Sequence, residues 1–503
     1  MMPPDIYKLN CVTNDRLYML LPAYKLVFII FLCFFATAVS AQLSIAEVFS
    51  DNMVLQRDKP ITVWGKAKAG KPVSVQFALQ QKSIVADTAG KWQIVFDPFT
   101  VSATPQNLSI SSDASTLVLK NILVGDVWLC SGQSNMEYTL DRKLKRYAAP
   151  KRGIDEAEAE LTKLKPAGIR YLYVERNLKK IPLLPTQGWT DGNDTLVRYA
   201  SAIGYFFAKD IFEKTNVPIG IISSTWGGTR IEHWQPDWSY RQSKLFKDSA
   251  TSPDFKIEGI HPGQMYDALI EPLIPFAVKG VLWYQGESNA TIEDQQVYPA
   301  KFELFVNTWR SLFKDNNLPF YYVQIAPHLY STRKDKKRHS TILLPEFWEA
   351  QSSSLKLNNV GMVVTTDLVD NLSDIHPSYK WTIGRRLALW ALEKDYKIKQ
   401  AAYSGPMYVS AKRKKNTIIL NFDHTGTGLA SSDGKDLTWF TIAGKDGKFV
   451  NATAVIEGKK VMVSSPEIKK PTSVRFAWDE KAQPNLFNKE GLPALPFRTD
   501  KKL

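Results

Sequence analysis

The sequence is poor in cysteine, with only three among its 503 residues. Cys11 and Cys33 lie in an N-terminal segment that we expect to be removed, which leaves Cys130 alone in the mature chain. A single cysteine excludes an intramolecular disulfide, so the fold must be stabilised by its hydrophobic core. The spacings typical of zinc sites, metalloproteases and EF-hand calcium loops are also missing. We therefore expect neither a metal nor another cofactor.

The sequence also lacks an apolar run of the roughly 20 residues that a membrane-spanning helix needs. A shorter run ends near Ala36 and is followed by Val39-Ser40-Ala41, small residues suited to signal peptidase. We therefore predict a signal peptide over residues 1–41, beginning at either Met1 or Met19. This predicts a protein secreted from a bacterium or exported to its periplasm, without stable membrane insertion after cleavage.

Lysine and arginine outnumber acidic residues, and the formal net charge is +14. The basic residues are dispersed, without the clusters or zinc-finger spacings typical of nucleic-acid binding. We therefore expect no nucleic-acid partner, and interpret the charge as an aid to solubility or as attraction to acidic glycans.

Hydrophobic patterning divides the mature chain into three predicted domains. Short alternating segments punctuated by glycine predict an N-terminal β-sandwich domain over residues 42–119. Apolar strands that alternate with helices predict an α/β domain with a parallel sheet over residues 120–398. Short strands return over residues 399–503 and predict a C-terminal β-domain. Helices are predicted at residues 200–214, 300–313 and 380–394, and a charge-rich surface insertion at residues 141–165.

Polar or glycine-rich turns follow three of the predicted parallel strands. They are Ser131-Gly132-Gln133-Ser134-Asn135-Met136, the turn from Ser223 to Arg230, and Gln285-Gly286-Glu287-Ser288-Asn289. Reactive groups of open α/β sheets gather beyond the carboxyl ends of the strands, so these turns are predicted to meet in one cleft.

A serine nucleophile needs a base within hydrogen-bond reach, usually a histidine oriented by a carboxylate. Of six histidines, His376 is the best candidate, because it follows a predicted strand and Asp374 lies two residues before it. Residue spacing alone does not decide between Ser134 and Ser288, since each lies in a Gly-x-Ser-Asn turn.

The chain resembles a known family in four ordered blocks, GQSNM, WGGT, WYQGESN and DIHP, and in an N-terminal segment over residues 48–56. These blocks are similar to those of SGNH hydrolases, specifically sialate O-acetylesterases and related carbohydrate acetylesterases. The resemblance implies a flavodoxin-like three-layer α/β/α hydrolase domain flanked by β-sandwich-like domains. It also implies a serine esterase that removes O-acetyl groups through an acetyl-enzyme intermediate.

The resemblance implies Ser134 as nucleophile and His376 as general base. Asp374 is the implied orienting acid, with Asp370 or Glu287 as alternatives, because many members place the acid three residues before the histidine and this chain has serine there.

An oxyanion hole is implied from the backbone N–H groups of Ser134 and Gly228 and the side-chain amide of Asn289. Candidate substrate contacts are Gln133, Arg230, Gln285 and Glu287. For Arg230, a salt bridge that steadies its loop is an equally good interpretation.

The implied partner is an O-acetylated glycan or sialic acid, with 9-O-acetyl sialic acid first and acetylated xylan or another plant glycan as the alternative. A noncatalytic glycan-binding protein is an alternative hypothesis of a different functional class, and intact Ser134, Asn289 and His376 argue against it. A lipase or thioesterase is disfavoured because no extended apolar lid is evident. The oligomeric state and the acetylated hydroxyl position stay open.

Overall fold

The computed structural model describes residues 42–163, 168–176, 186–192, 195–244, 256–257, 259–333 and 338–500. The predicted signal peptide lies outside these residues. Within them, no helix is both long and apolar enough to cross a bilayer. The same residues contain no group of three or more His, Cys, Asp or Glu arranged to hold a metal ion.

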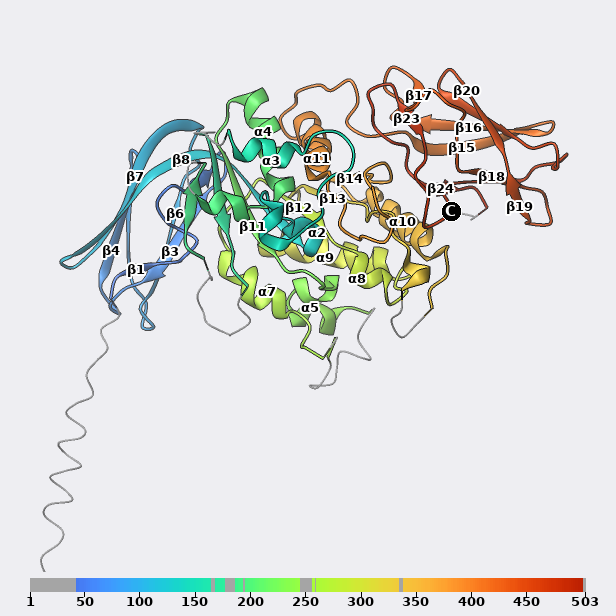
Figure 1. Ribbon diagram of the computed structural model, residues 1–503. Helices are drawn as coiled ribbons and strands as arrows, with labels where there is room; N and C mark the ends of the chain where they lie inside the picture. The colour runs from blue at the N-terminus through green and yellow to red at the C-terminus, as the bar shows by residue number, and fades with distance from the viewer. Residues whose placement is uncertain are drawn as a thin grey trace, which may run out of the picture. The chain divides into compact units, whose positions relative to one another are not determined.

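A central parallel sheet is built from apolar strands, in the order β10-β9-β11-β8-β12-β13-β14 (Figure 1). Its parallel members are β9 (Ile169–Tyr173), β11 (Ile219–Thr225), β8 (Ser115–Gly132), β12 (Gly280–Tyr284), β13 (Phe320–Val323) and β14 (Val360–Val363). The edge strand β10 (Trp189–Asp191) runs antiparallel to β9. Strands β11 to β14 are buried along their whole length, as expected for a parallel sheet covered on both faces. The predicted α/β class is confirmed.

Four long helices cover this sheet: α4 (Ala202–Thr215), α9 (Tyr298–Leu312), α10 (Leu343–Ser353) and α11 (Lys380–Lys394). Ser201 caps α4 by accepting a hydrogen bond from the N–H of Gly204 at 3.3 Å. In Figure 1, α4 and α11 lie together on one side of the sheet, with α9 on the other. The three predicted helices correspond to α4, α9 and α11, with ends that differ by at most two residues.

The connections of the sheet create a crevice at the end of β8. From β8 the chain passes to β9 and β11 on one side, and later to β12, β13 and β14 on the other. Loops leaving the carboxyl ends of β8 and its neighbours therefore diverge in opposite directions, which opens a crevice where α/β proteins bind ligands. The turn at residues 131–136 lies at this point.

The N-terminal β-structure is continuous with the central sheet. A separate three-stranded sheet contains β1 (Ser44–Ile45), β3 (Ile61–Lys66) and β6 (Lys91–Phe96). The strands β2 (Val54–Gln56), β4 (Pro72–Phe77), β5 (Gln80–Val85) and β7 (Ser102–Ser112) join the sheet that contains β8. The boundary predicted between residues 119 and 120 falls inside the single strand β8, which runs from the N-terminal β-structure into the central sheet.

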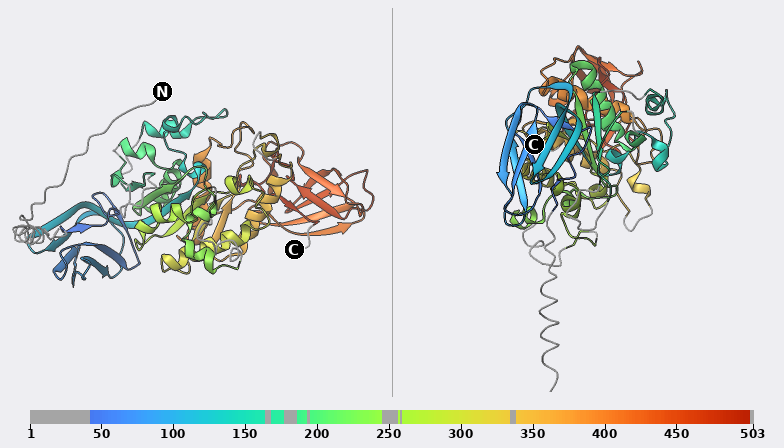
Figure 2. Two further views of the ribbon diagram at one scale, coloured as in Figure 1. Left: turned by 90° about the horizontal axis from the view of Figure 1, so that it is seen from below. Right: turned by 90° about the vertical axis from the view of Figure 1, so that its left-hand side faces the viewer.

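The C-terminal residues form the predicted β-structure, with three small antiparallel sheets (Figure 2). One has the order β15-β16-β21-β20 and a second the order β19-β18-β22-β24, while β17 pairs with β23. Their bounds are β15 (Met407–Lys414), β16 (Thr417–Asp423), β17 (Leu429–Ser431), β18 (Phe440–Ala443), β19 (Phe449–Asn451), β20 (Thr453–Glu457), β21 (Lys460–Ser464), β22 (Ser473–Phe476), β23 (Leu486–Asn488) and β24 (Phe497–Arg498).

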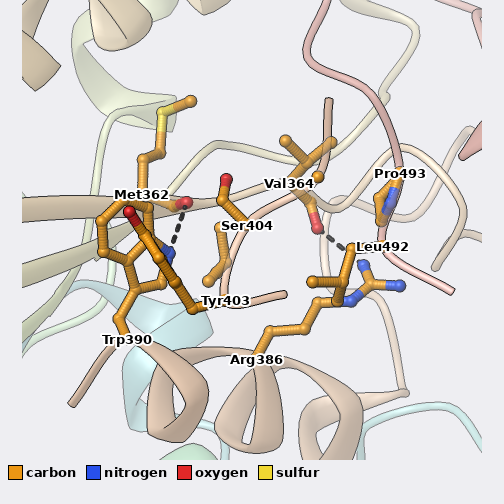
Figure 3. A pocket seen from close by; sticks show the side chains of 10 residues that line it. Met362, Val364, Arg386, Trp390, Tyr403, Ser404, Leu492 and Pro493 are labelled. Atoms are coloured by element: carbon orange, nitrogen blue, oxygen red, sulfur yellow. Dashed lines mark hydrogen bonds between the residues drawn. The ribbon is translucent and has the colours of Figure 1, made fainter. Parts of the chain in front are cut away.

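The C-terminal segment packs closely against α11 and the end of β14. Figure 3 shows Trp390 of α11, whose Nε1 donates to the carbonyl of Met362 at 3.2 Å. The ring of Tyr403 meets the indole edge to face, with 4.8 Å between the ring centroids. A void of about 10 Å³ remains beside them, roughly the space of one water molecule. Gly405 lines this void, and a side-chain carbon there would stand 1.8 Å from the carbonyl oxygen of Pro493. Only glycine therefore fits at this contact.

Candidate active site

Ser134 lies where β8 ends in the central crevice. The chain turns at Gly132, which has a φ of 130° and whose added Cβ would stand 2.2 Å from the carbonyl oxygen of Tyr284 in β12. Glycine is required by both the backbone conformation and this close approach. The short helix α2 (Ser134–Glu137) follows, so Ser134 is its first residue and remains partly exposed.

The loop after β14 brings His376 to Ser134. The Nε2 atom of His376 lies 2.9 Å from Ser134 Oγ, and both side chains are partly exposed. Asp374 accepts the backbone N–H of His376 at 2.9 Å, and the same Oδ1 lies 3.5 Å from Nδ1 of the ring. The hydrogen bond with His376 lowers the pKa of the Asp374 carboxyl. Asp374 is therefore an ionised carboxylate on the ring edge opposite Ser134.

The alternative acids are engaged elsewhere. Asp370 accepts hydrogen bonds from Arg152 Nε at 2.7 Å and from the hydroxyl of Tyr379 at 2.7 Å. Glu287 accepts from Nδ2 of Asn135 at 2.5 Å, and its side chain is buried. The structure therefore sets Asp374, rather than Asp370 or Glu287, beside the imidazole.

The loop at Gly227-Gly228 passes directly beside Ser134. A Cβ on Gly227 would stand 3.1 Å from Cβ of Ser134, so a side chain there would crowd the hydroxyl. The N–H of Gly227 donates to Glu137 at 2.9 Å, which fixes the loop, while Gly228 is exposed with a φ of 74°. As the first residue of α2, Ser134 has a backbone N–H without an intrahelical acceptor. Gly228 directly follows the residue that contacts Ser134, and the N–H groups of Ser134 and Gly228 stay the predicted backbone donors.

The predicted third donor, Asn289, is contradicted by the structure. Asn289 is fully buried in α8 (Glu287–Ala290), and its Nδ2 donates to Glu232 at 3.0 Å and to Asp294 at 2.7 Å. Lys301 pairs with the same two carboxylates. Buried carboxylates need such partners, so both amide hydrogens of Asn289 are used within this network. Asn289 holds two loops together and does not point to Ser134.

The predicted substrate contacts of Gln133, Gln285 and Glu287 also need correction, because all three are at most 4% exposed. Gln285 Nε2 donates to Gln133 Oε1 at 3.3 Å and to the carbonyl of Thr229 at 3.2 Å, which ties three turns together. Arg230 forms a salt bridge at 3.1 Å with Glu232, as the alternative interpretation predicted.

A buried polar network lies behind Ser134 and was missed from the sequence. Asn135 donates to Glu287 at 2.5 Å and to the carbonyl of Ile375 at 3.0 Å, while its Oδ1 accepts from Lys380 Nζ at 2.5 Å. Burial lowers the pKa of Lys380 to about 7 and raises that of Glu287. Asn135, the residue after Ser134, is thereby hydrogen-bonded to Ile375, the residue before His376.

Replacing Lys380 by methionine should lower the free energy of unfolding by about 3 kcal/mol, because Asn135 loses a buried hydrogen bond and the buried Glu287 carboxyl loses the attraction of a nearby cation. The double variant Lys380→Met with Glu287→Gln should recover part of this loss, since no uncompensated charge remains. Urea unfolding of the two single variants and of the double variant measures this coupling. Simple additivity of the two single effects would contradict a coupling of Lys380 and Glu287 through Asn135.

The pH dependence of stability offers a second check on Lys380. Its pKa is about 7 in the folded state against 10.5 ordinarily, so between these values the unfolded chain holds the extra proton. Stability should therefore rise as pH increases through this window, and the Lys380→Met variant should lack this rise.

Tyr147 is a further contact that no sequence pattern indicated. It comes from the predicted surface insertion, which forms the short helices η1 (Arg142–Lys145) and α3 (Glu156–Leu161). Its hydroxyl donates to the carbonyl of Ser134 at 3.3 Å, and its ring centroid is 5.2 Å from that of His376. Tyr147 also stacks on Tyr138, so the insertion contributes a wall of the crevice.

Comparison with known proteins places this site in a family. The family model described as "Carbohydrate esterase, sialic acid-specific acetylesterase" matches residues 124–393, more than half of the chain. Human sialate O-acetylesterase is 28% identical over 401 residues, covering 72% of this chain and 73% of the human protein. The Pongo abelii sialate O-acetylesterase is 26% identical over 493 residues, covering 90% and 91%.

A solved structure is similar along nearly the whole chain. It is a carbohydrate acetylesterase from Xanthomonas citri, with a TM-score of 0.80 and 33% sequence identity, covering 91% of this chain and 100% of that one. The match includes the β-structure on both sides of the central sheet. The chain therefore belongs to the sialic acid-specific acetylesterase family of carbohydrate esterases, and it is an esterase that removes O-acetyl groups from carbohydrates.

Proposed function

We propose that this esterase hydrolyses O-acetyl esters of sialic acid, with Ser134 as nucleophile, His376 as general base and Asp374 as the orienting carboxylate. The observation that supports this most strongly is the 2.9 Å contact between His376 Nε2 and Ser134 Oγ in the crevice at the end of β8. A serine hydroxyl becomes reactive when a base at this distance accepts its proton. The family and its curated relatives favour a sialate as the sugar.

In the acylation step, Ser134 Oγ attacks the acetyl carbonyl carbon while its proton passes to His376 Nε2. The C=O bond becomes a C–O⁻ group, which the N–H groups of Ser134 and Gly228 stabilise. When the tetrahedral intermediate collapses, the bond to the sugar oxygen breaks and His376 returns the proton to that oxygen. The products are the deacetylated sugar and an acetyl ester on Ser134.

Deacylation repeats the sequence with water. His376 removes a proton from the water, the resulting hydroxide attacks the acetyl-enzyme, and Ser134 leaves as an alkoxide that regains its proton from His376. Asp374 holds the ring and stabilises the imidazolium that forms in both steps. The products of the full cycle are the deacetylated sugar and acetate, and Ser134 and His376 are regenerated.

The surrounding architecture is part of the proposal. We assign a three-layer SGNH hydrolase domain to residues 120–398, with β-sandwich-like domains over residues 42–119 and 399–503. Strand β8 runs without a break through the N-terminal β-domain and the hydrolase domain, so these two domains form a single packed body. A signal peptide over residues 1–41 would export the enzyme to the periplasm or the medium, where acetylated glycans are met.

Acetate release from two glycans tests the proposed substrate. The purified mature chain is given 9-O-acetyl-N-acetylneuraminic acid and, in parallel, acetylated xylan. The proposal expects release from the sialate with kcat/KM at least about tenfold higher than from xylan, a difference of about 1.4 kcal/mol in transition-state binding. Release from xylan alone would indicate that the substrate is a plant glycan and not a sialate. No release from either by folded protein would favour a glycan-binding role.

A further inference from the structure

The crevice has a positively charged edge next to Ser134. Glu137, the last residue of α2, is only 2% exposed at its side chain and pairs with two cations. These are Lys145, whose Nζ lies 3.0 Å from Oε1, and Arg176, which donates to Oε2. The carboxylate is covered, whereas the side chains of Arg176 and Lys145 are 36% and 31% exposed. Two cations share one carboxylate, so the edge presents excess positive charge to solvent.

This charge lies immediately across Gly227 from the reacting hydroxyl. The position of a Cβ on Gly227 is 3.1 Å from Cβ of Ser134 and 3.4 Å from Nη2 of Arg176. A sugar whose acetyl group reaches Ser134 therefore lies near the Arg176 guanidinium. Glu137 also holds the Gly227 N–H, so the cations and the loop are fixed as one unit.

A flat aromatic surface adjoins the cations. The indole of Trp226 is partly exposed, and the Arg176 guanidinium lies 5.3 Å from its ring centroid. This contact orients the planar guanidinium, and a guanidinium held in one plane is well suited to bind both oxygens of a carboxylate. Apolar sugar faces pack on such rings. The combination suits a sugar that carries an anionic group.

We propose that Arg176 and Lys145 form a recognition site for the carboxylate of the acetylated sugar, with Trp226 beneath its ring, so that the enzyme selects acidic over neutral sugars. The inference rests on the proposed function and adds the residues that set the substrate class. Arg176 and Lys145 act on binding and do not take part in proton transfer.

The test compares 9-O-acetyl-N-acetylneuraminic acid with its methyl ester, which keeps the acetyl group and removes the negative charge. For the wild type, kcat/KM should be about tenfold higher for the acid, the usual effect of one hydrogen bond to a charged group. The difference should shrink at high salt, because both cations are partly exposed. In Arg176→Gln, the ratio of kcat/KM for the acid to kcat/KM for the methyl ester should approach one, because KM for the acid rises. Lys145→Gln should reduce this ratio in part.

Arg475→Gln is the matched control, because Arg475 pairs with Asp500 in the C-terminal β-structure and should leave the ratio at its wild-type value. Equal hydrolysis of acid and methyl ester by the wild type, or an unchanged ratio in Arg176→Gln, would overturn the recognition site while the serine mechanism stands. If the enzyme hydrolyses acetylated xylan but neither the sialate nor its methyl ester, both the proposed substrate and the carboxylate recognition site are overturned.

Discussion

Replacing Ser134 by alanine should lower kcat for acetate release by about 10⁴-fold or more, with the free energy of unfolding unchanged. The loss is expected to be this large because no other hydroxyl contacts His376 in the described part of the chain. The Ser134 side chain is partly exposed, so its removal leaves no buried cavity. Steady-state kinetics on 9-O-acetyl-N-acetylneuraminic acid, with urea unfolding of the same samples, measures both quantities.

The chain offers a matched control in Ser288, which occupies the second Gly-x-Ser-Asn turn. Only its backbone joins the polar network around the turns, where its N–H donates to Gln133 at 3.3 Å. Ser288→Ala should therefore keep kcat within about twofold of wild type, as expected for a surface change that creates no unpaired buried group. Loss of activity in Ser288→Ala with activity retained in Ser134→Ala would reverse the assignment.

Replacing Asp374 by asparagine should lower kcat by about 10³-fold, while KM changes little. The carboxylate lies 3.5 Å from Nδ1 and accepts the backbone N–H of His376 at 2.9 Å. Asparagine keeps the shape but loses the charge that stabilises the imidazolium in both transition states.

Asp370→Asn is the control for this substitution, since Asp370 was the alternative acid. Its carboxylate binds Arg152 and Tyr379 away from the imidazole, so kcat should stay within about threefold of wild type. A larger loss in Asp370→Asn than in Asp374→Asn would contradict the geometry proposed for the site.

The sequence predicted which segments meet but not how their side chains are directed. Parallel strands end at the same edge of a sheet, so the turn at Ser134 and the loop at His376 were expected to converge, and their side chains are 2.9 Å apart. The direction of Asn289 depends on Asp294 and Lys301, which follow it in the chain, and on Glu232, which is distant in sequence and lies in the short helix η3 (Ile231–Trp234). No local pattern indicates that these charges are buried together, so Asn289 was assigned to the oxyanion hole.

Two further differences have similar causes. The first half of β8 alternates between exposed and partly buried residues, whereas its second half is fully buried. In the sequence this change of pattern indicates a domain boundary. In the structure it marks the point where one strand passes from its partners in the N-terminal β-structure to its partners in the central sheet. The burial of Lys380 has no local signal, because lysine at a helix start is ordinarily solvated and only the tertiary structure brings Lys380 to Asn135, which in turn bonds to Glu287.

Trapping the acetyl-enzyme tests the central claim most directly. The wild type is mixed with an excess of 9-O-acetyl-N-acetylneuraminic acid, quenched in acid within the first turnovers, digested and examined by peptide mass spectrometry. We expect an acetyl group on the Ser134 hydroxyl, absent from the Ser134→Ala protein. An acetyl group on Ser288, or full activity without any acetylated serine under conditions in which deacylation limits the rate, would contradict it.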